Sequence, residues 1–470
     1  MNRNPKHRTP VLKLCSLVKW SRGKTGLSDT ALNKTVGSVQ NDSRKIKQGD
    51  VFLAIKTEND DGHKYIDNAF KAGAIAAIVN KKNSVECSAK YRKKLIFVSD
   101  TIKAVQKAAA CFRKEMGILF IGITGSNGKT TTRSFVSAVL GEGLKVGETF
   151  GNWNNHIGVP LSILNFTGDE WVGVIEMGAN HAKEIHDLSM IVRPDISIIT
   201  NIGYGHIGLF GSLSRTTEAK FEIVDGLNRK NGFLLLNGDD QRIVKEATRH
   251  DVNKIFYGLS SKCDCRAVDI EIDAKKGIEF SVDDFRFQLP IPGRHFIYSV
   301  LPAIYLGKRC GIPNEIIADS IRSLKPAFMR GAVQTKNGVD FIVDCYNANP
   351  SSMKSAINYL VDVSKPSSRA AVVGDMLELG SSSKRLHKEL GKMLARAQIR
   401  RLVTVGEWAS EVAQAAINEG INKRNVSIAD NAHKALEAVN EIIRQGDMVL
   451  LKGSRGIHLE TVFENYKGKR

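Results

Sequence analysis

A chain of 470 residues is too long for one ordinary hydrophobic core, so two or three domains are expected. Apolar residues make up 42% and charged residues 25% of the sequence, which is typical of a folded globular protein and excludes a mainly disordered one. Lys and Arg outnumber Asp and Glu by 68 to 49, and the formal charge of +19 favours polyanionic partners such as phosphorylated substrates, anionic lipid or nucleic acid.

The cysteines and the N-terminal residues indicate a cellular compartment. Seven scattered cysteines exclude a dense, even-numbered secreted disulfide framework and favour a reducing compartment. The basic N-terminus lacks a signal-peptide core, because the apolar run 11–18 is short and is interrupted by Lys13. No run approaches the length of a membrane span, so no membrane insertion is expected. We therefore expect a cytoplasmic protein and interpret the basic N-terminus as a solvated surface.

Short apolar runs alternate with helical stretches along the chain, which predicts parallel α/β sheets. In the first third, a helix is predicted over 101–114, and we expect a small N-terminal domain at 1–115. The predicted strands before that helix are 51–55, 74–79 and 95–98.

A central domain is expected at 116–325, because a new strand is predicted at 118–123 and Pro326 stops the last helix. Its other predicted strands are 171–175, 196–200, 233–236 and 255–257. Alternating polarity over 263–289 predicts a small β-meander, which is followed by helices at 296–309 and 314–324.

The last third repeats the alternation and predicts a Rossmann-like domain at 326–470. Its predicted strands are 341–345, 370–373, 401–405 and 448–451. The predicted fold class is therefore α/β in three domains, of which the central one has a parallel sheet of the P-loop type.

The sharpest local feature is residues 122–132, which read Gly-Ile-Thr-Gly-Ser-Asn-Gly-Lys-Thr-Thr-Thr. An apolar strand leads into a glycine-rich turn, and a helix is expected to open after Lys129. Backbone N–H groups of such a turn and of a helix N-terminus bind phosphate oxygens. Lys129 is expected to neutralise the β- and γ-phosphates, and Thr130 offers a hydroxyl to Mg²⁺. The loop therefore predicts a nucleoside triphosphate with Mg²⁺, although it does not by itself name a reaction.

Motifs in all three thirds resemble those of the Mur ligases. They lie at 42–44, 49–50, 61–63, 122–132, 151–160, 176–180, 200–203 with His206, 344–350, 374–380 and 452–456. Tyr-Asn-Ala-Asn-Pro at 346–350 and Gly-Asp-Met-Leu-Glu-Leu-Gly at 374–380 are similar to the members that add D-alanyl-D-alanine to a UDP-muramoyl tripeptide. The resemblance also implies that domain 1–115 binds the UDP-sugar.

The resemblance implies an ATP-dependent ligase that joins D-alanyl-D-alanine to the terminal carboxylate of UDP-N-acetylmuramoyl-tripeptide. ATP would phosphorylate the carboxylate, and the dipeptide amine would attack the acyl phosphate. The expected partners are these two substrates, with no nucleic acid, and the expected state is a monomer. Mg²⁺, expected as two ions, must accompany the reaction because an anionic carboxylate meets an anionic γ-phosphate.

The resemblance also assigns roles to individual residues. The expected catalytic residues are Lys129, Lys220, Glu176 and His206, and the expected metal ligands are Thr130, Glu176, His206 and Lys220 in carbamylated form. The expected nucleotide-binding residues are Gly125, Ser126, Asn127, Gly128, Lys129, Thr130, Thr131, Arg330, Asp344 and Asn347. The expected substrate-binding residues are Asp42, Ser43, Arg44, Asn154, Asn155, Lys452 and Arg455. Carbamylation would replace the cation of Lys220 by an anion suited to Mg²⁺.

Phe296 and Ser299 stand where the family usually carries asparagine, and Phe296 is expected to stack on or pack beside adenine. Three alternatives stay open. They are another Mur-type or folylpolyglutamate-like carboxylate–amine ligase, a nucleic-acid-dependent P-loop ATPase motivated by the basic charge, and a non-catalytic binding protein motivated by Phe296 and Ser299. The third residue of the tripeptide, diaminopimelate or lysine, is also left open.

Overall fold

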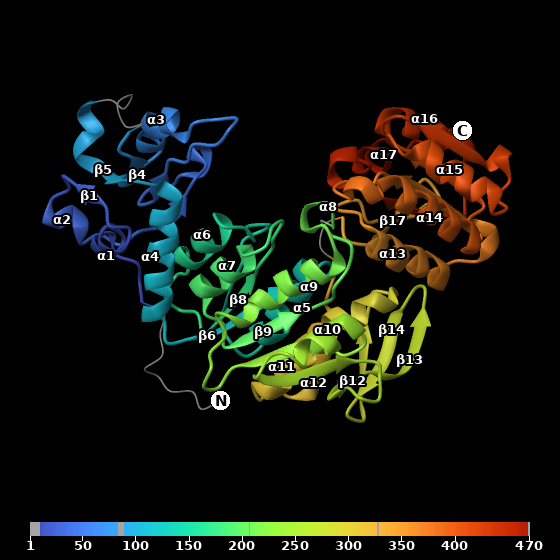
Figure 1. The fold of residues 1–470 in the computed structure, drawn as a ribbon, viewed down its shortest axis with the longest axis horizontal. Coiled ribbons are helices and arrows are strands. Elements are labelled where there is room, and N and C mark those ends of the chain that lie inside the picture. Colours follow the sequence, from blue (N-terminus) through green and yellow to red (C-terminus); the bar gives the residue numbers. More distant parts are fainter. Residues whose placement is uncertain (1–9, 83–88, 206, 327–328, 469–470) are drawn as a thin grey trace.

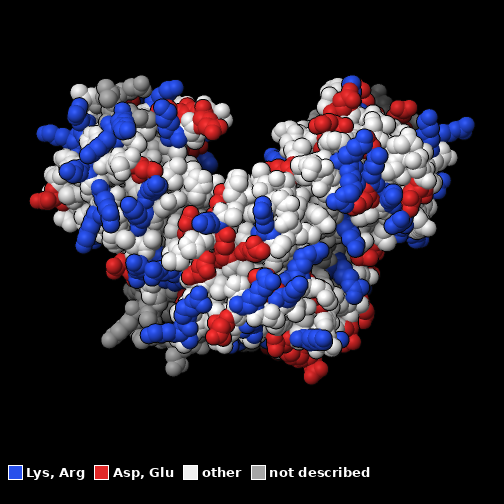
Figure 2. Space-filling model, viewed as in Figure 1, with Lys and Arg blue, Asp and Glu red and all other residues white. Residues whose placement is uncertain are grey.

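The structure, a computed structural model, describes residues 10–82, 89–205, 207–326 and 329–468. Three lobes follow one another along the chain, and the N-terminal and C-terminal lobes stand on opposite sides above the central one (Figure 1). Figure 2 shows a deep notch between these two outer lobes, with Lys and Arg spread over all three. Within the described ranges, no helix has both the length and the apolar character needed to cross a bilayer.

The N-terminal lobe contains a five-stranded sheet in the order β1-β5-β4-β3-β2. Strands β2 to β5 pair in parallel, and β1 is antiparallel to β5 at the edge. The strands are β1 (Lys24–Thr25), β2 (Val39–Gln40), β3 (Val51–Leu53), β4 (Ala76–Asn80) and β5 (Leu95–Val98). The helices are α1 (Leu14–Trp20), α2 (Asp29–Leu32), α3 (Ile66–Lys71) and α4 (Thr101–Glu115). The predicted helix over 101–114 is confirmed, and Asp100 caps it by accepting a hydrogen bond from the Lys103 N–H.

The central lobe is built on a parallel seven-stranded sheet in the order β12-β11-β10-β9-β6-β8-β7. The strands are β6 (Leu119–Thr124), β7 (Val146–Glu148), β8 (Val172–Glu176), β9 (Ile196–Ile199), β10 (Phe233–Asn237), β11 (Asn253–Gly258) and β12 (Cys265–Arg266). The helices are α5 (Lys129–Gly141), α6 (Gly158–Leu164), α7 (Glu184–Val192), α8 (Ile207–Phe210), α9 (Leu213–Phe221), α10 (Gln241–Ala247), α11 (Ile297–Arg309) and α12 (Asn314–Arg322).

A separate antiparallel sheet of three strands confirms most of the predicted meander. Its strands are β13 (Val268–Asp273), β14 (Gly277–Val282) and β15 (Phe285–Leu289). The start of the predicted stretch differs, because Cys265 and Arg266 pair in parallel with β11 and extend the main sheet instead.

The C-terminal lobe has a six-stranded sheet in the order β16-β17-β21-β18-β19-β20, in which only β16 is antiparallel to its neighbour. The strands are β16 (Ala332–Lys336), β17 (Val339–Val343), β18 (Arg369–Gly374), β19 (Arg401–Val405), β20 (Val426–Ala429) and β21 (Met448–Lys452). The helices are α13 (Pro350–Val363), α14 (Ser383–Arg396), α15 (Ala409–Asn418), α16 (Ala432–Ile442) and α17 (Glu460–Asn465). The predicted α/β class is confirmed in each lobe.

The central sheet is buried on both faces, as expected for parallel strands covered by helices. On β6, Ile121 and Ile123 join one hydrophobic cluster with Phe135 of α5, whereas Phe120 points to the opposite face and joins a second cluster with Phe112 of α4. Because both faces are filled, polar chemistry is confined to the ends of the strands. The carboxyl ends of β6, β8 and β17 carry the residues described next.

Candidate functional site

A cavity of about 670 Å³ lies between the central and C-terminal lobes and collects most of the residues singled out from the sequence. The predicted residues on its wall are Ser126, Asn127, Gly128, Lys129, Thr130, Thr131, Asn154, Asn155, Glu176, Arg330, Asp344, Asn347 and Lys452. The predicted residues that do not line it are Gly125, Lys220, Asp42, Ser43, Arg44 and Arg455. His206 lies outside the described residues. The cavity is therefore formed jointly by the two lobes.

The phosphate loop adopts the predicted strand–turn–helix path, with β6 before it and α5 beginning at Lys129. Gly125 has φ +146°, and a Cβ there would lie 2.0 Å from Thr200 Oγ1, so only glycine fits. Gly128 caps α5 with φ +77°. Ser126 is tied to Gly203: its hydroxyl accepts from the Gly203 N–H at 2.8 Å and donates to the Gly203 carbonyl at 3.2 Å. The loop is thus held in shape by the segment that follows β9.

Lys129 points into this loop, where its ammonium donates to the Gly125 carbonyl at 2.9 Å. Desolvation lowers the pKa of Lys129, and the charge of Arg330 acts in the same direction while Glu176 opposes both. The ammonium therefore sits among other charges at the cavity, in the position that a phosphate-binding lysine requires.

Glu176 ends β8 with only 1% of its surface exposed and borders the cavity. Its Oε1 accepts from Asn154 Nδ2 at 2.7 Å, so Asn154 orients the carboxylate. Its Oε2 is buried and has no hydrogen-bond partner among the described residues. Arg133 on α5 is the closest cation, with Nε 3.7 Å from Oε2, but its Nη1 is already bound to the Thr149 carbonyl and to Glu148. A buried carboxylate oxygen without a donor is open to a cation.

Lys220 lies on α9 and is 2% exposed, behind the cavity wall rather than on it. Burial and, to a lesser extent, the positive charge of Lys129 lower its pKa to about 7, against the opposing effect of Glu222 and Glu184. A substantial share of its side chain is therefore a neutral amine near neutral pH. Its ammonium also lies 5.3 Å from the centre of the Phe210 ring.

Lys452 and Asp344 form a buried pair on the C-terminal side of the cavity. Lys452 ends β21 and Asp344 follows β17, its neighbour in the sheet. The Lys452 ammonium, 1% exposed, is 2.7 Å from Asp344 Oδ2 and 3.0 Å from the Asn347 carbonyl. The sequence predicts substrate contact for Lys452; the structure shows its charge engaged in holding Asp344 and Asn347.

Replacing Lys452 by methionine is expected to destabilise the protein by about 2–4 kcal/mol, because Asp344 would keep its charge without its buried partner. This loss of stability is smaller than for a fully buried pair, because the Asp344 side chain is 21% exposed and can be hydrated in the variant. Thermal or urea unfolding measures the loss. Lys434→Met is the matched control, because Lys434 pairs with Asp430 on the surface and should cost less than about 1 kcal/mol. Equal losses in both variants would contradict the role of the buried pair.

Two aromatic side chains, Tyr346 and Phe296, are part of the cavity wall. The Arg330 guanidinium lies 3.9 Å from the centre of the Tyr346 ring. Phe296 is 2% exposed and packs against Phe135, His295 and Tyr359, with ring centres 6.4, 4.2 and 6.2 Å away. Phe296 therefore joins the central and C-terminal lobes, and little of its ring is left open for stacking.

The predicted substrate residues outside the cavity form local ion pairs. Arg44 donates to both carboxylate oxygens of Asp42 at 2.9 Å, and these side-chain hydrogen bonds hold the pKa of Asp42 below its usual value. The Arg44 side chain is 87% exposed on the N-terminal lobe. Arg455 lies 3.1 Å from Glu460 and is half exposed.

The structure adds wall residues that the sequence interpretation did not select. They include Glu184, Asn201, Asn237, Asp240, Tyr346 and Ser351. Asn201 and Tyr346 lie inside the motifs at 200–203 and 344–350. Their position in sequence next to other motif residues is therefore the signal that could have identified them. Arg133, by contrast, is identified only by its burial beside Glu176.

Comparison with known proteins agrees with this architecture. Three family models match: "Mur ligase family, catalytic domain" over 35–113, "Mur ligase middle domain" over 123–307 and "Mur ligase, glutamate ligase domain" over 329–455. The UDP-N-acetylmuramoyl-tripeptide–D-alanyl-D-alanine ligase of Bacillus subtilis is 34% identical over 97% of both chains, and that of Escherichia coli is 31% identical over 91% of this chain and 93% of its own.

Solved structures agree as well. A crystal structure of MurF from Acinetobacter baumannii has a TM-score of 0.84 at 28% identity, covering 97% of this chain and 99% of its own. MurF ligase from Thermotoga maritima in complex with ADP has a TM-score of 0.79 at 28% identity, covering 94% and 98%. By sequence over nearly its whole length and by fold, this chain belongs to the Mur ligase family.

Proposed function

We propose that this chain joins D-alanyl-D-alanine to the terminal carboxylate of UDP-N-acetylmuramoyl-tripeptide, with cleavage of ATP to ADP and phosphate, as a step of peptidoglycan synthesis. The observation that carries the proposal is the match of relatives bearing that name over nearly the full length of both chains. A match confined to the phosphate loop would support only nucleotide binding. This one includes the outer lobes, which must hold the two substrates.

In the proposed reaction, a carboxylate oxygen attacks the γ-phosphorus of ATP and the bond to the β-phosphate oxygen breaks, releasing ADP. The dipeptide amine then attacks the carbonyl carbon, and phosphate leaves with the formation of the amide. The residues act by positioning and by neutralising charge. Lys129 and Arg330 face the triphosphate, while Asp344 accepts a hydrogen bond from the ribose. Closure of the two lobes around the cavity keeps water from the acyl phosphate.

The wall residues fit Mg²⁺. Glu176 offers a buried carboxylate oxygen that accepts no hydrogen bond from the described residues and lies 3.7 Å from Arg133 Nε, and Thr130 offers a hydroxyl on the same cavity. Among the described parts of the chain, no group of three or more His, Cys, Asp or Glu could hold a metal ion alone. Mg²⁺ is usually bound in this way, by one or two carboxylates together with water and substrate phosphates. When bound, Mg²⁺ would withdraw negative charge from the phosphoryl oxygens. His206 is proposed as a further ligand, and two ions are proposed.

Lys220 is proposed to carry a carbamate. The neutral amine of Lys220 adds to CO₂ with formation of a C–N bond, and a proton is released from the nitrogen. The product is an anionic carbamate, which stands where an ordinary lysine carries a positive charge. Burial of Lys220 supports this, because it favours the neutral form of the amine. The modification would also relieve the repulsion between Lys220 and Lys129.

Uptake of CO₂ at Lys220 is expected to rise with pH through about 7. The neutral amine is the reactive form, and its share increases as pH rises through the lowered pKa of about 7, whereas an ordinary lysine needs a pH above about 10. Carbon-13 NMR at fixed dissolved ¹³CO₂ would show the carbamate signal growing between about pH 6 and pH 8. The signal should be absent from Lys220→Met. A midpoint near that of free lysine would contradict the assignment.

The N-terminal lobe is proposed to bind the UDP part of the substrate, with Asp42, Ser43 and Arg44 at the nucleotide. The Arg44 side chain is 87% exposed, and the guanidinium N–H groups that are not bound to Asp42 would donate to the diphosphate. We further propose domains at 1–115, 116–325 and 326–470, and a monomeric enzyme. Asn155 and Arg455 are proposed on the substrate side of the site.

The direct test is a reconstituted reaction with ATP, Mg²⁺, UDP-N-acetylmuramoyl-tripeptide and D-alanyl-D-alanine. Phosphate release is expected only when both acceptor substrates are present, and mass spectrometry should show the UDP-pentapeptide. Phosphate release that DNA or RNA stimulates, without pentapeptide, would favour the nucleic-acid-dependent ATPase and reject the ligase. Other amino acids or dipeptides in place of D-alanyl-D-alanine distinguish related ligases.

A further inference from the structure

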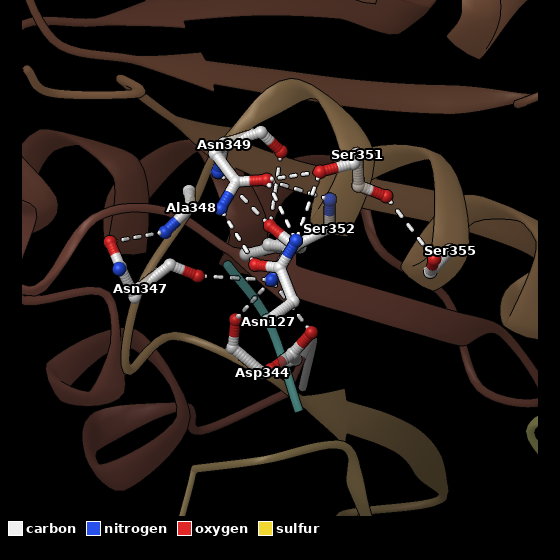
Figure 3. A network of polar contacts seen from close by, with 9 residues as sticks. Asn127, Asp344, Asn347, Ala348, Asn349, Ser351, Ser352 and Ser355 are labelled. Atoms are coloured by element: carbon white, nitrogen blue, oxygen red, sulfur yellow. Dashed lines mark hydrogen bonds and ion pairs between the residues drawn. The ribbon is translucent and has the colours of Figure 1, made fainter. Parts of the chain in front are cut away.

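The side chain of Asn127 points away from the phosphate loop and toward the C-terminal lobe (Figure 3). Its Oδ1 accepts from Asn349 Nδ2 at 2.7 Å, and its Nδ2 donates to Ser351 Oγ at 2.9 Å and to Asn349 Oδ1 at 3.3 Å. The two amides thus form a reciprocal pair between residues 222 positions apart in sequence. The amide of Asn127 is therefore engaged by the other lobe and is not directed at the cradle of the loop.

The partner residues are held rigidly before they meet Asn127. Asn349 is the N-cap of the 14-residue helix α13 and is 3% exposed. Its Oδ1 accepts from the Ser352 N–H at 3.0 Å, and Ser352 Oγ accepts from the Asn349 N–H at 3.0 Å, which completes a capping box. Ser351 Oγ donates to the same Asn349 Oδ1 at 2.8 Å. Little side-chain freedom is left to be lost on contact with the loop.

The backbone of Asn127 is fixed from the opposite side by its own lobe. Its N–H donates to Asn201 Oδ1 at 2.9 Å, and its carbonyl accepts from Thr200 Oγ1 at 2.6 Å and from Asn201 Nδ2 at 3.0 Å. The lobes also pack closely here, since a Cβ on Gly203 would lie 2.5 Å from Ser351 Oγ. Asn127 is therefore clamped between the segment after β9 and the start of α13.

We propose that Asn349 and Ser351 are positioning residues of the C-terminal lobe, which act through Asn127 to hold the phosphate loop in its working shape. The proposal rests on the function proposed above, because only in that function does the phosphate loop bind ATP. When the C-terminal lobe moves away, Asn127 loses three hydrogen bonds and the loop loses one of its two supports. A second contact moves with them, since the Gly208 N–H donates to the Glu378 carbonyl at 2.8 Å. The cradle is complete only while the lobes are in contact.

The test is a double-mutant cycle in the full-length chain with Asn127→Ala, Ser351→Ala and both together. Ser351→Ala removes one hydrogen bond of Asn127 and is expected to lower kcat about five- to ten-fold, and Asn127→Ala, which removes all three, should lower it at least as much. The double variant should be no worse than Asn127→Ala alone, because that variant already lacks the contact between Asn127 and Ser351. The KM for the UDP-substrate should stay unchanged. Ser368→Ala is the matched control, since Ser368 lies in the same lobe and its hydroxyl donates locally to the Lys365 carbonyl.

Small-angle X-ray scattering of the same variants provides a readout independent of turnover. Loss of the contact is expected to increase the radius of gyration relative to wild type, as the lobes spend more time apart, with unfolding temperature unchanged. Wild-type protein that does not ligate would reject the proposed function, and scattering would still test the contact. Wild-type protein that ligates beside a Ser351→Ala variant with full kcat and unchanged radius would overturn this inference, as would additive losses in the double variant.

Discussion

Replacing Lys129 by alanine is expected to reduce the ligation rate by about 10³-fold or more. Lys129 is the cation at the start of α5 whose ammonium already lies within the phosphate loop, bound to the Gly125 carbonyl. Removing a preorganised donor from a developing charge typically costs about 10² to 10³ in kcat, and here the binding site also loses a full positive charge. Steady-state phosphate release with both acceptor substrates measures the effect.

Lys145→Ala is a suitable control for Lys129, because Lys145 is exposed and pairs with Asp169 on the surface. Its turnover should match wild type. Near-normal turnover of Lys129→Ala would contradict the assignment of the triphosphate to this loop. It would also reject the ligase mechanism that depends on that assignment. Isothermal titration calorimetry with ADP distinguishes a loss of nucleotide binding from a loss of the chemical step. A folded variant that still binds ADP has kept the nucleotide-binding shape of the loop and has lost only the chemical step.

Replacing Lys220 by alanine is expected to lower turnover by about 10²-fold, with partial recovery on addition of short carboxylic acids. The reason is geometric: the alanine variant leaves a buried space where an added carboxylate could stand in for the carbamate. Lys220→Met provides the matched comparison, because methionine fills that space and should not be rescued. Full activity of the alanine variant without additive would reject the carbamate, and equal rescue of both variants would show that the acid acts elsewhere.

The sequence predicted long or strongly patterned elements well and short edge elements poorly. The predicted strand, turn and helix around Lys129 are confirmed. Gly128 adopts the left-handed backbone conformation at the start of the helix, which glycine tolerates readily, so the residue type there was a usable signal. Strands β1, β2 and β12 have two residues each, and β7 has three, so none carries a readable hydrophobic period. Their pairing is decided by the sheet they join. Cys265 illustrates this, because its alternating surroundings predicted a meander but its backbone extends the parallel sheet.

Which residues meet in the site was less predictable than which motifs supply them. Lys452 and Asp344 are 108 positions apart, and their contact depends on β21 lying next to β17. Strand order of this kind is set by tertiary packing, so a motif can supply the lysine without revealing its partner. The same holds for Asn127 and Asn349, which local patterns place in separate domains. Asn154 is predicted to contact substrate, and its bond to Glu176, which orients that carboxylate, appears only in the structure.

The position of β21 in the C-terminal sheet has a consequence for biosynthesis. It is the last strand in the described sequence, yet it lies between β17 and β18 in the middle of the sheet. On the ribosome, β17 and β18 are made more than 70 residues before the strand that joins them, since β18 ends at Gly374 and β21 starts at Met448. Until then both present unpaired edges, which are prone to pairing with other chains. We expect nascent chains stalled before residue 448 to recruit chaperones, and release of β21 from the exit tunnel to end that dependence.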